Sequence, residues 1–129
     1  MGTISCTKEF TFDSCHHLEN YVGACSRLHG HTYKLRVTVT GKPHHLDKTG
    51  MLIDFKVLNN IVQDKIISKL DHFNLNEVLS YNPTAENMAY NMFKVIDQHL
   101  KPIYQNKIKV TKVTLWETPT SYATYKEEY

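Results

Sequence analysis

The segment CSRLHGHTYKLRVTVT, residues 25–40, carries the clearest secondary-structure signal in the chain. From Tyr33 to Thr40 apolar and polar residues alternate strictly, which is the period of a half-buried β-strand. Extended backwards, the same alternation places His29 and His31 on the apolar face, with their Cα atoms about 7 Å apart. Two imidazoles therefore point to one side at the start of this strand. Gly30 between them lets other backbone or a ligand come close.

Two histidines in this arrangement can bind one metal ion from one side. Zinc held by three histidines and a water molecule is a common catalytic arrangement, and a His-x-His pair supplies two of those ligands. His16 follows a predicted first strand that would pair with this one, so it is the expected third ligand, with His17 as the competing candidate. The alternative is a set of ordinary histidines near a strand end.

Cys25 lies in a loop four residues before His29, and its spacing allows three interpretations. It could be a buried structural thiol. It could be a fourth zinc ligand, which would close the site and make it structural. It could also be a thiolate that lies beside the metal without binding it and acts as a catalytic base.

The composition is that of one ordinary globular domain spanning residues 1–129. The net charge of +2 and the absence of a basic run argue against a nucleic-acid partner. With no apolar run near 18 residues and no signal-peptide pattern at the N-terminus, we expect no membrane partner and a cytoplasmic protein. Three cysteines form no disulfide framework, which favours reduced thiols in that compartment.

The predicted order of elements is ββααββ, an α+β fold. Strands are expected at Thr3–Asp13, His31–Gly41, Ile108–Glu117 with a bulge near Thr111, and Tyr122–Tyr125, and helices from Phe55 to about Leu70 and from the Thr84 N-cap up to Pro102. Two helices can cover one face of a four-stranded antiparallel sheet. The other face carries polar residues such as Lys34 and Arg36, so we expect it to be solvated in a monomer or buried in an oligomer.

Two further places carry candidate functional groups. Asp71-His72 could simply terminate the first helix, or its carboxylate and imidazole could relay protons. Glu117 is in phase with Val113 and Leu115, so its carboxylate points with apolar neighbours, where it is costly unless paired. It could bind a guanidine-like ligand edge through two parallel hydrogen bonds, or it could be exposed at a frayed strand end.

Six motifs span nearly the whole chain: FTFDSCH (10–16), C-x-x-x-HGH (25–31), GMLIDF (50–55), LDH-x-x-LN (70–76), NPT-x-EN (82–87) and WET (116–118). In order and spacing they resemble the 6-pyruvoyltetrahydropterin synthase superfamily. The three residues between Cys25 and His29 match the spacing of the bacterial queuosine-pathway branch, the 6-carboxytetrahydropterin synthases, whereas the animal pyruvoyl enzymes have a longer gap.

The resemblance implies a fold, an assembly and a set of roles. The fold is the tunnelling fold, whose subunits close a β-barrel around a central tunnel, commonly as a homohexamer of two stacked trimers with active sites between subunits. The implied roles are Zn²⁺ binding by His16, His29 and His31, proton abstraction by Cys25, proton relay by Asp71 and His72, and recognition of a pterin triphosphate by Glu117, with Thr84 and Arg27 as further substrate-binding residues. Lys34, Arg27 and Lys56 are candidates for holding the triphosphate, and His17 has no implied role.

The implied reaction converts 7,8-dihydroneopterin triphosphate into 6-carboxytetrahydropterin, acetaldehyde and triphosphate. A 6-pyruvoyltetrahydropterin synthase or an aldolase-like relative would share every site residue but process the side chain differently. A hypothesis of another class is a non-catalytic pterin- or metal-binding oligomer in which Cys25 is a fourth metal ligand.

Overall fold

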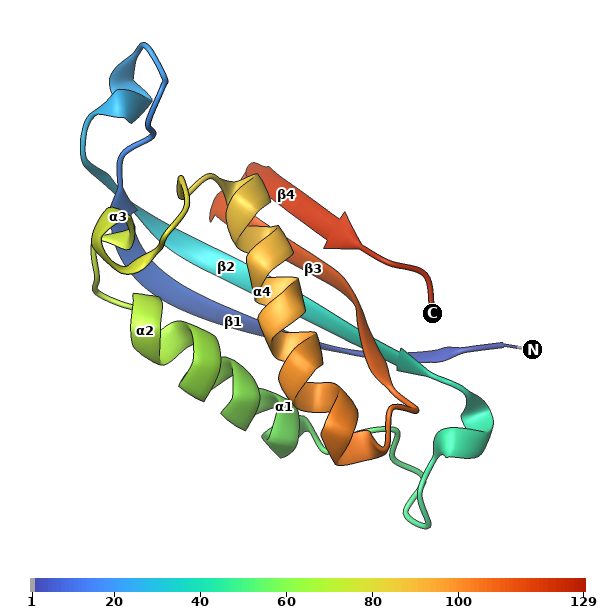
Figure 1. The fold of residues 1–129 in the computed structure, drawn as a ribbon. Coiled ribbons are helices and arrows are strands. Elements are labelled where there is room, and N and C mark those ends of the chain that lie inside the picture. Colours follow the sequence, from blue (N-terminus) through green and yellow to red (C-terminus); the bar gives the residue numbers. More distant parts are fainter. Residues whose placement is uncertain (1) are drawn as a thin grey trace.

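The computed structural model describes residues 2–129, which form a four-stranded antiparallel sheet in the order β1-β2-β3-β4 with the helices on one face (Figure 1). The elements are β1 (Ile4–His16), η1 (Ala24–Ser26), β2 (His29–Gly41), η2 (Pro43–His45), α1 (Phe55–Val62), η3 (Gln63–Ile67), α2 (Ser68–Leu70), α3 (Leu75–Val78), α4 (Ala85–Leu100), η4 (Lys101–Tyr104), β3 (Lys109–Thr118) and β4 (Ser121–Lys126). The predicted α+β fold and its ββααββ order are confirmed.

β1 and β2 form a long hairpin that carries the histidines at one end. The two strands pair without interruption from Ile4 opposite Gly41 to His16 opposite His29. Both are longer at this end than the sequence predicts, because the alternation of inward and outward residues continues to the histidines themselves. The connection, residues 17–28, projects beyond the sheet (Figure 1). His16 therefore reaches the two other histidines from the neighbouring strand.

Both predicted long helices are present. Residues 55–70 form one continuous helical segment that begins at the Asp54 N-cap, although its middle part, η3, has π-helical geometry that the sequence did not indicate. Thr84 is the N-cap of α4, and its hydroxyl accepts the backbone N–H of Asn87. Among residues 2–129, no helix combines the length and the apolar character needed to cross a bilayer.

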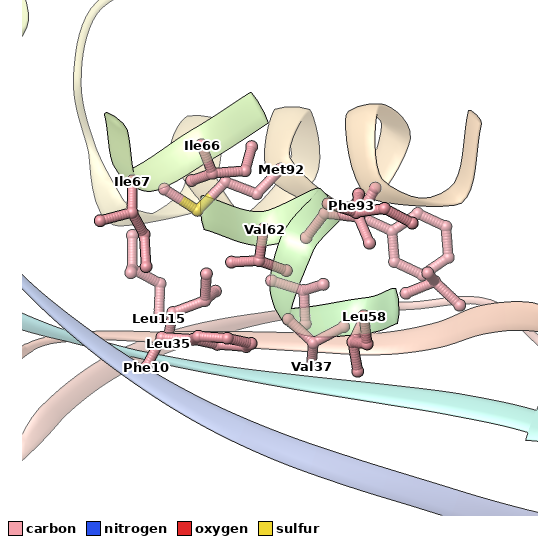
Figure 2. Close-up of a cluster of buried hydrophobic side chains, with 14 of the residues drawn as sticks. Phe10, Leu35, Val37, Leu58, Val62, Ile66, Ile67, Met92, Phe93 and Leu115 are labelled. Carbon is pink, nitrogen blue, oxygen red and sulfur yellow. The ribbon is translucent and has the colours of Figure 1, made fainter. Parts of the chain in front are cut away.

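The apolar stripes of these helices pack on one face of the sheet (Figure 2). The residues labelled in this cluster are Phe10, Leu35, Val37 and Leu115 from the sheet and Leu58, Val62, Ile66, Ile67, Met92 and Phe93 from the helices. A fully buried side chain of this size stabilises the fold by about 1.5–3 kcal/mol. The core therefore fixes the strands on which the histidines are placed.

β3 contains two irregularities. Thr38 pairs with Lys112 and Val39 with Val110, which leaves Thr111 as the extra residue of the predicted bulge. The pairing with β4 shifts between Trp116 and Thr118, so Glu117 has no cross-strand partner there. The pairing of β3 with β4 is thus irregular at Glu117, the glutamate that the sequence singled out.

The face of the sheet away from the helices is polar. Hydroxyl groups are hydrogen-bonded across strands, such as Ser5 with Thr40 at 2.8 Å and Thr114 with Thr124 at 2.9 Å. β1 and β4 are the outer strands, and the sheet of the single chain is open.

Candidate active site

The three histidines predicted as metal ligands converge at one end of the β1–β2 hairpin. Alternation along each strand places His16, His29 and His31 on the same side as the core. Their ring centroids lie 4.7–5.0 Å apart, and their ligand atoms all lie within 4.8 Å of one another. His16 is 1% exposed, whereas the other two are partly exposed. The group of three histidines is therefore buried on the side of His16 and accessible on the side of His29 and His31.

Backbone carbonyls fix the tautomers of two of the rings. Nδ1 of His16 lies 2.8 Å from the Pro83 carbonyl oxygen, and Nδ1 of His29 lies 2.7 Å from the Arg27 carbonyl oxygen. A carbonyl accepts only from a protonated nitrogen, so the lone pair of each neutral ring is on Nε2. These two Nε2 atoms face each other at 3.1 Å. Two facing lone pairs at that distance require a cation or a proton between them.

His31 supplies the third donor. Its Nε2 is buried and has no hydrogen-bond partner among residues 2–129. Buried polar atoms in folded proteins are almost always satisfied, so an unpartnered imidazole nitrogen beside two other histidines fits the role of a metal ligand. Three neutral nitrogen donors suit zinc and leave a fourth coordination position open.

The protonation of these histidines agrees with metal binding. The pKa of His16 is lowered to about 4, mainly by burial and also by the neighbouring histidines, while the hydrogen bond to the Pro83 carbonyl opposes the shift. The pKa of His31 is lowered as well, first by burial and then by His29. Both rings are therefore neutral at pH 7, which is the form that binds a metal.

His17 lies outside the metal-ligand group. Its backbone N–H donates to Asn76 Oδ1 at 2.8 Å, and its carbonyl accepts from Asn76 Nδ2 at 3.0 Å. His16, and not the competing candidate His17, is thus the third member of the group.

Cys25 lies in η1, within the loop that projects from the sheet, and is partly buried. Its sulfur does not belong to the histidine group, whose ligand atoms within the described residues come from the three imidazoles. Its carbonyl accepts the backbone N–H of Leu18 at 2.7 Å, which ties Cys25 to the end of β1. This arrangement gives no support to Cys25 as a fourth ligand.

Asp71 and His72 form the predicted carboxylate–imidazole pair, with His72 Nδ1 3.0 Å from Asp71 Oδ2. The pair lies against Asp13, whose N–H donates to Asp71 Oδ1 and whose carbonyl accepts the His72 N–H. The Asp13 hydrogen bond, followed by the His72 contact, holds the pKa of Asp71 below its usual value. Asp13, Asp71 and His72 form a second group of possible ligands, distinct from the three histidines. The pair is therefore not within ligating distance of the three histidines, although His72 and His31 line the same cavity of about 460 Å³.

Glu117 is half-buried and not at a freely exposed strand end. Its pKa is raised, mainly by burial and then by the nearby Glu86 carboxylate, while the Ala85 N–H and His29 oppose this shift. It lines a cavity of about 540 Å³ together with His31, Tyr33 and Trp116. The Glu117 carboxylate thus lies beside the histidines, and its oxygens can accept further hydrogen bonds.

The remaining predicted substrate-binding residues differ in their placement. Thr84 caps α4 directly after Pro83, the residue that binds His16. Arg27 contributes its carbonyl to His29. Lys34 lines the Glu117 cavity, where its ammonium lies 5.0 Å from the centroid of the Trp116 ring. Lys56 lines a different hollow, at the start of α1, and is not brought to this site.

Sequence reasoning missed the backbone partners that hold the site together. Pro83 O fixes His16, and the adjacent Ala85 N–H contributes to the environment of Glu117. The segment from Pro83 to Ala85, at the start of α4, therefore supports both His16 and Glu117. The NPT-x-EN motif marked this segment, but side-chain chemistry alone could not assign a role to a proline carbonyl.

Comparisons with known proteins agree with this geometry. The family described as 6-pyruvoyl tetrahydropterin synthase matches residues 5–128. A 6-carboxy-5,6,7,8-tetrahydropterin synthase from Haemophilus influenzae is 34% identical and aligns over 94% of this chain and 97% of its own length. A protein of the same name from Bacillus subtilis is 37% identical over 81% and 71% of the two chains. A dihydroneopterin monophosphate aldolase from Pyrococcus furiosus is 34% identical over 83% of each.

The fold is also found among solved structures. The 6-pyruvoyl tetrahydropterin synthase of Caenorhabditis elegans matches with a TM-score of 0.82 and 27% identity, over 99% of this chain and 98% of that one. The family match covers nearly the whole chain and includes every motif that builds the site. The chain belongs to the 6-pyruvoyl tetrahydropterin synthase family.

Proposed function

We propose that this protein is a zinc-dependent 6-carboxy-5,6,7,8-tetrahydropterin synthase that acts on 7,8-dihydroneopterin triphosphate. The observation that carries the proposal is the convergence of three imidazole rings beside the half-buried Glu117, with the buried Nε2 of His31 lacking a hydrogen-bond partner among residues 2–129. His16, His29 and His31 would hold the zinc. When bound, zinc polarises the hydroxyls of the substrate side chain and acidifies the adjacent C–H bonds.

Glu117 would bind the pterin ring. The pyrimidine edge of a pterin presents neighbouring N–H groups in a guanidine-like arrangement, which match the two oxygens of a carboxylate. An ionised Glu117 would orient the ring so that its side chain points toward the histidines. Thr84 and Arg27 would be further substrate-binding residues, and Lys34, which lines the same cavity as Glu117, would be the cation for the triphosphate.

Cys25 would serve as the base that removes a proton from the substrate side chain, and Asp71 with His72 would relay it. In the single chain Asp71 and His72 stand outside the histidine group, and we propose that the pair completing the site comes from a neighbouring subunit. The open edges of β1 and β4 and the polar sheet face support such an assembly. We propose a homohexamer of two trimers, each trimer closing a barrel.

The carboxy product is favoured over the pyruvoyl product by the short spacing from Cys25 to His29 and by relatives named for that reaction. The reaction would consume one water molecule and release acetaldehyde and triphosphate. We place it in the cytoplasm and in queuosine biosynthesis. The Pyrococcus relative makes an aldolase reaction the second candidate.

Product analysis of the zinc-loaded protein with dihydroneopterin triphosphate tests the proposal. We expect acetaldehyde, triphosphate and a carboxylated tetrahydropterin by mass spectrometry. A pyruvoyl product would favour the animal-type reaction. A hydroxymethyl dihydropterin, together with a glycolaldehyde fragment that still carries the triphosphate, would favour the aldolase. Binding without turnover would favour a non-catalytic module.

A further inference from the structure

Two asparagine side chains hold the base of the loop that carries Cys25. Asn76 accepts the His17 N–H at 2.8 Å and donates to the His17 carbonyl at 3.0 Å. Asn82 does the same for Glu19, accepting its N–H at 3.0 Å and donating to its carbonyl at 3.3 Å. Each amide thus satisfies both backbone groups of one residue, as a neighbouring strand would.

The residue between them faces the other way. In an extended chain, the N–H and C=O groups of alternate residues point to one side and those of the intervening residue to the opposite side. Leu18, between the two clamped residues, donates its N–H to the Cys25 carbonyl at 2.7 Å. Residues 17–19 therefore connect the two asparagines on one side to Cys25 on the other.

Both asparagines are themselves fixed to helices. Asn76 lies in the first turn of α3, where its N–H donates to Asn74 Oδ1 at 3.0 Å. The carbonyl of Asn82 accepts the Thr84 N–H at 2.8 Å and the Asn87 side-chain amide at 3.0 Å, directly before α4. The same segment contains Pro83, which binds His16. The position of Cys25 is in this way linked to the metal group.

We propose that Asn76 and Asn82 are positioning residues that set the place of Cys25 relative to the three histidines. The inference rests on the proposed function, in which Cys25 is the base. It also explains why residues 17–19 follow the metal ligand His16 without a helix or a strand partner of their own. Neither asparagine touches the metal group, so removing either side chain should displace the thiol and leave the metal site intact.

The test compares Asn76→Ala and Asn82→Ala with Asn60→Ala, an exposed asparagine of α1 whose side chain makes no hydrogen bond among residues 2–129. The hydrogen bonds of Asn76 to His17 and of Asn82 to Glu19 form the asparagine clamp. Hydrogen–deuterium exchange of residues 17–28 in the zinc-loaded proteins measures how well this clamp protects the backbone, independently of activity. Removing both partners of a backbone residue should speed exchange there on the order of tenfold. Asn76→Asp, which keeps the acceptor and loses the donor, should fall between wild type and Asn76→Ala.

Turnover of dihydroneopterin triphosphate provides the second readout. Because small displacements of a reacting group are costly, kcat should fall on the order of tenfold or more while KM and zinc content stay near wild type. Unchanged exchange in both alanine variants, or faster exchange with wild-type kcat, would overturn the inference. If wild type turns over no substrate, the proposed function fails, and the exchange data still decide whether the clamp exists.

Discussion

At the scale of single residues, the distinction between a ligand and a base can be tested at Cys25. Three histidines leave a coordination position open, whereas a Cys-plus-three-His site does not. Cys25→Ala should therefore keep its zinc after dialysis while turnover falls about a hundredfold or more, the scale for losing a positioned acid–base group. His29→Ala should lose both its zinc and its turnover. If Cys25→Ala loses zinc as His29→Ala does, Cys25 is a ligand and the catalytic proposal is wrong.

Glu117 allows a test of substrate recognition. Glu117→Gln keeps the shape of the side chain but loses the charge that strengthens two hydrogen bonds, each worth roughly 1.5–3 kcal/mol. Substrate binding should weaken at least tenfold, measured by titration calorimetry on the zinc-loaded protein. Since burial raises the pKa of Glu117, wild-type affinity should also decline as the pH falls, beginning at a higher pH than for an exposed carboxylate. Wild-type affinity in the glutamine variant would exclude this role.

His16 should make the zinc-free protein sensitive to acid. Its pKa is about 4 in the folded chain, compared with 6.5 for an ordinary histidine. Between these values the unfolded chain binds a proton that the folded chain does not, so lowering the pH through this window favours unfolding. The Tm of the zinc-free protein should fall between pH 7 and pH 5, and His16→Asn should flatten that slope. The matched variant His44→Asn, in an exposed turn, should keep the wild-type dependence of Tm on pH. Equal slopes of Tm against pH in wild type and both variants would contradict the prediction.

At the scale of elements, a buried carboxylate joins α4 to β3. Asp97 is 8% exposed, accepts the Val110 N–H at 2.9 Å and lies 3.1 Å from Lys101 Nζ. Asp97→Ala leaves that buried N–H without a partner, which should lower the free energy of unfolding by about 2 kcal/mol in urea titrations. Asp64→Ala removes an exposed pair with Lys65 and should change it by less than about 1 kcal/mol. Similar midpoints for the two variants would mean that this connection contributes little.

The elements show which features could be predicted from the sequence. Strong periodic patterns mark the strand that contains Leu35 and Val37 and the helix that contains Met92 and Phe93. The existence of both elements, and which side of each is buried, were therefore predictable. The three metal-group histidines followed from strand alternation and pairing. The π-helical turn η3, the burial of Asp97 and the asparagine clamps depend on partners distant in sequence, which no local pattern records.

At the scale of the whole molecule, the sheet of the single chain has two open edges. Its outer strands leave backbone groups of β1 and β4 unpaired with other strands over much of their length, and such edges invite pairing with another chain. Residues 71–74 cover the end of β1 near Asp13 and Cys15, so the rest of β1 is the part available to a neighbouring subunit. Asp71 and His72, the proposed relay pair, lie at this boundary, where a subunit interface would place them beside another chain.

A proline in β4 tests the assembly. Glu127 donates its N–H to Thr111 in β3, so by alternation the Tyr125 N–H also faces β3 and the Thr124 N–H faces the open edge. Thr124→Pro therefore removes a hydrogen bond only from the edge that a neighbouring β1 would occupy, and Thr124→Val controls for loss of the hydroxyl pair with Thr114. Light scattering should give a wild-type mass of about six times the 15.0 kDa subunit, a similar mass for the valine variant and a smaller one for the proline variant.

Because the relay pair would then be absent from the site, turnover of the proline variant should fall with its mass, whereas zinc should remain bound to the single chain. A wild-type mass near 15.0 kDa at micromolar concentration would show that the chain acts alone and that the site proposed between subunits does not exist.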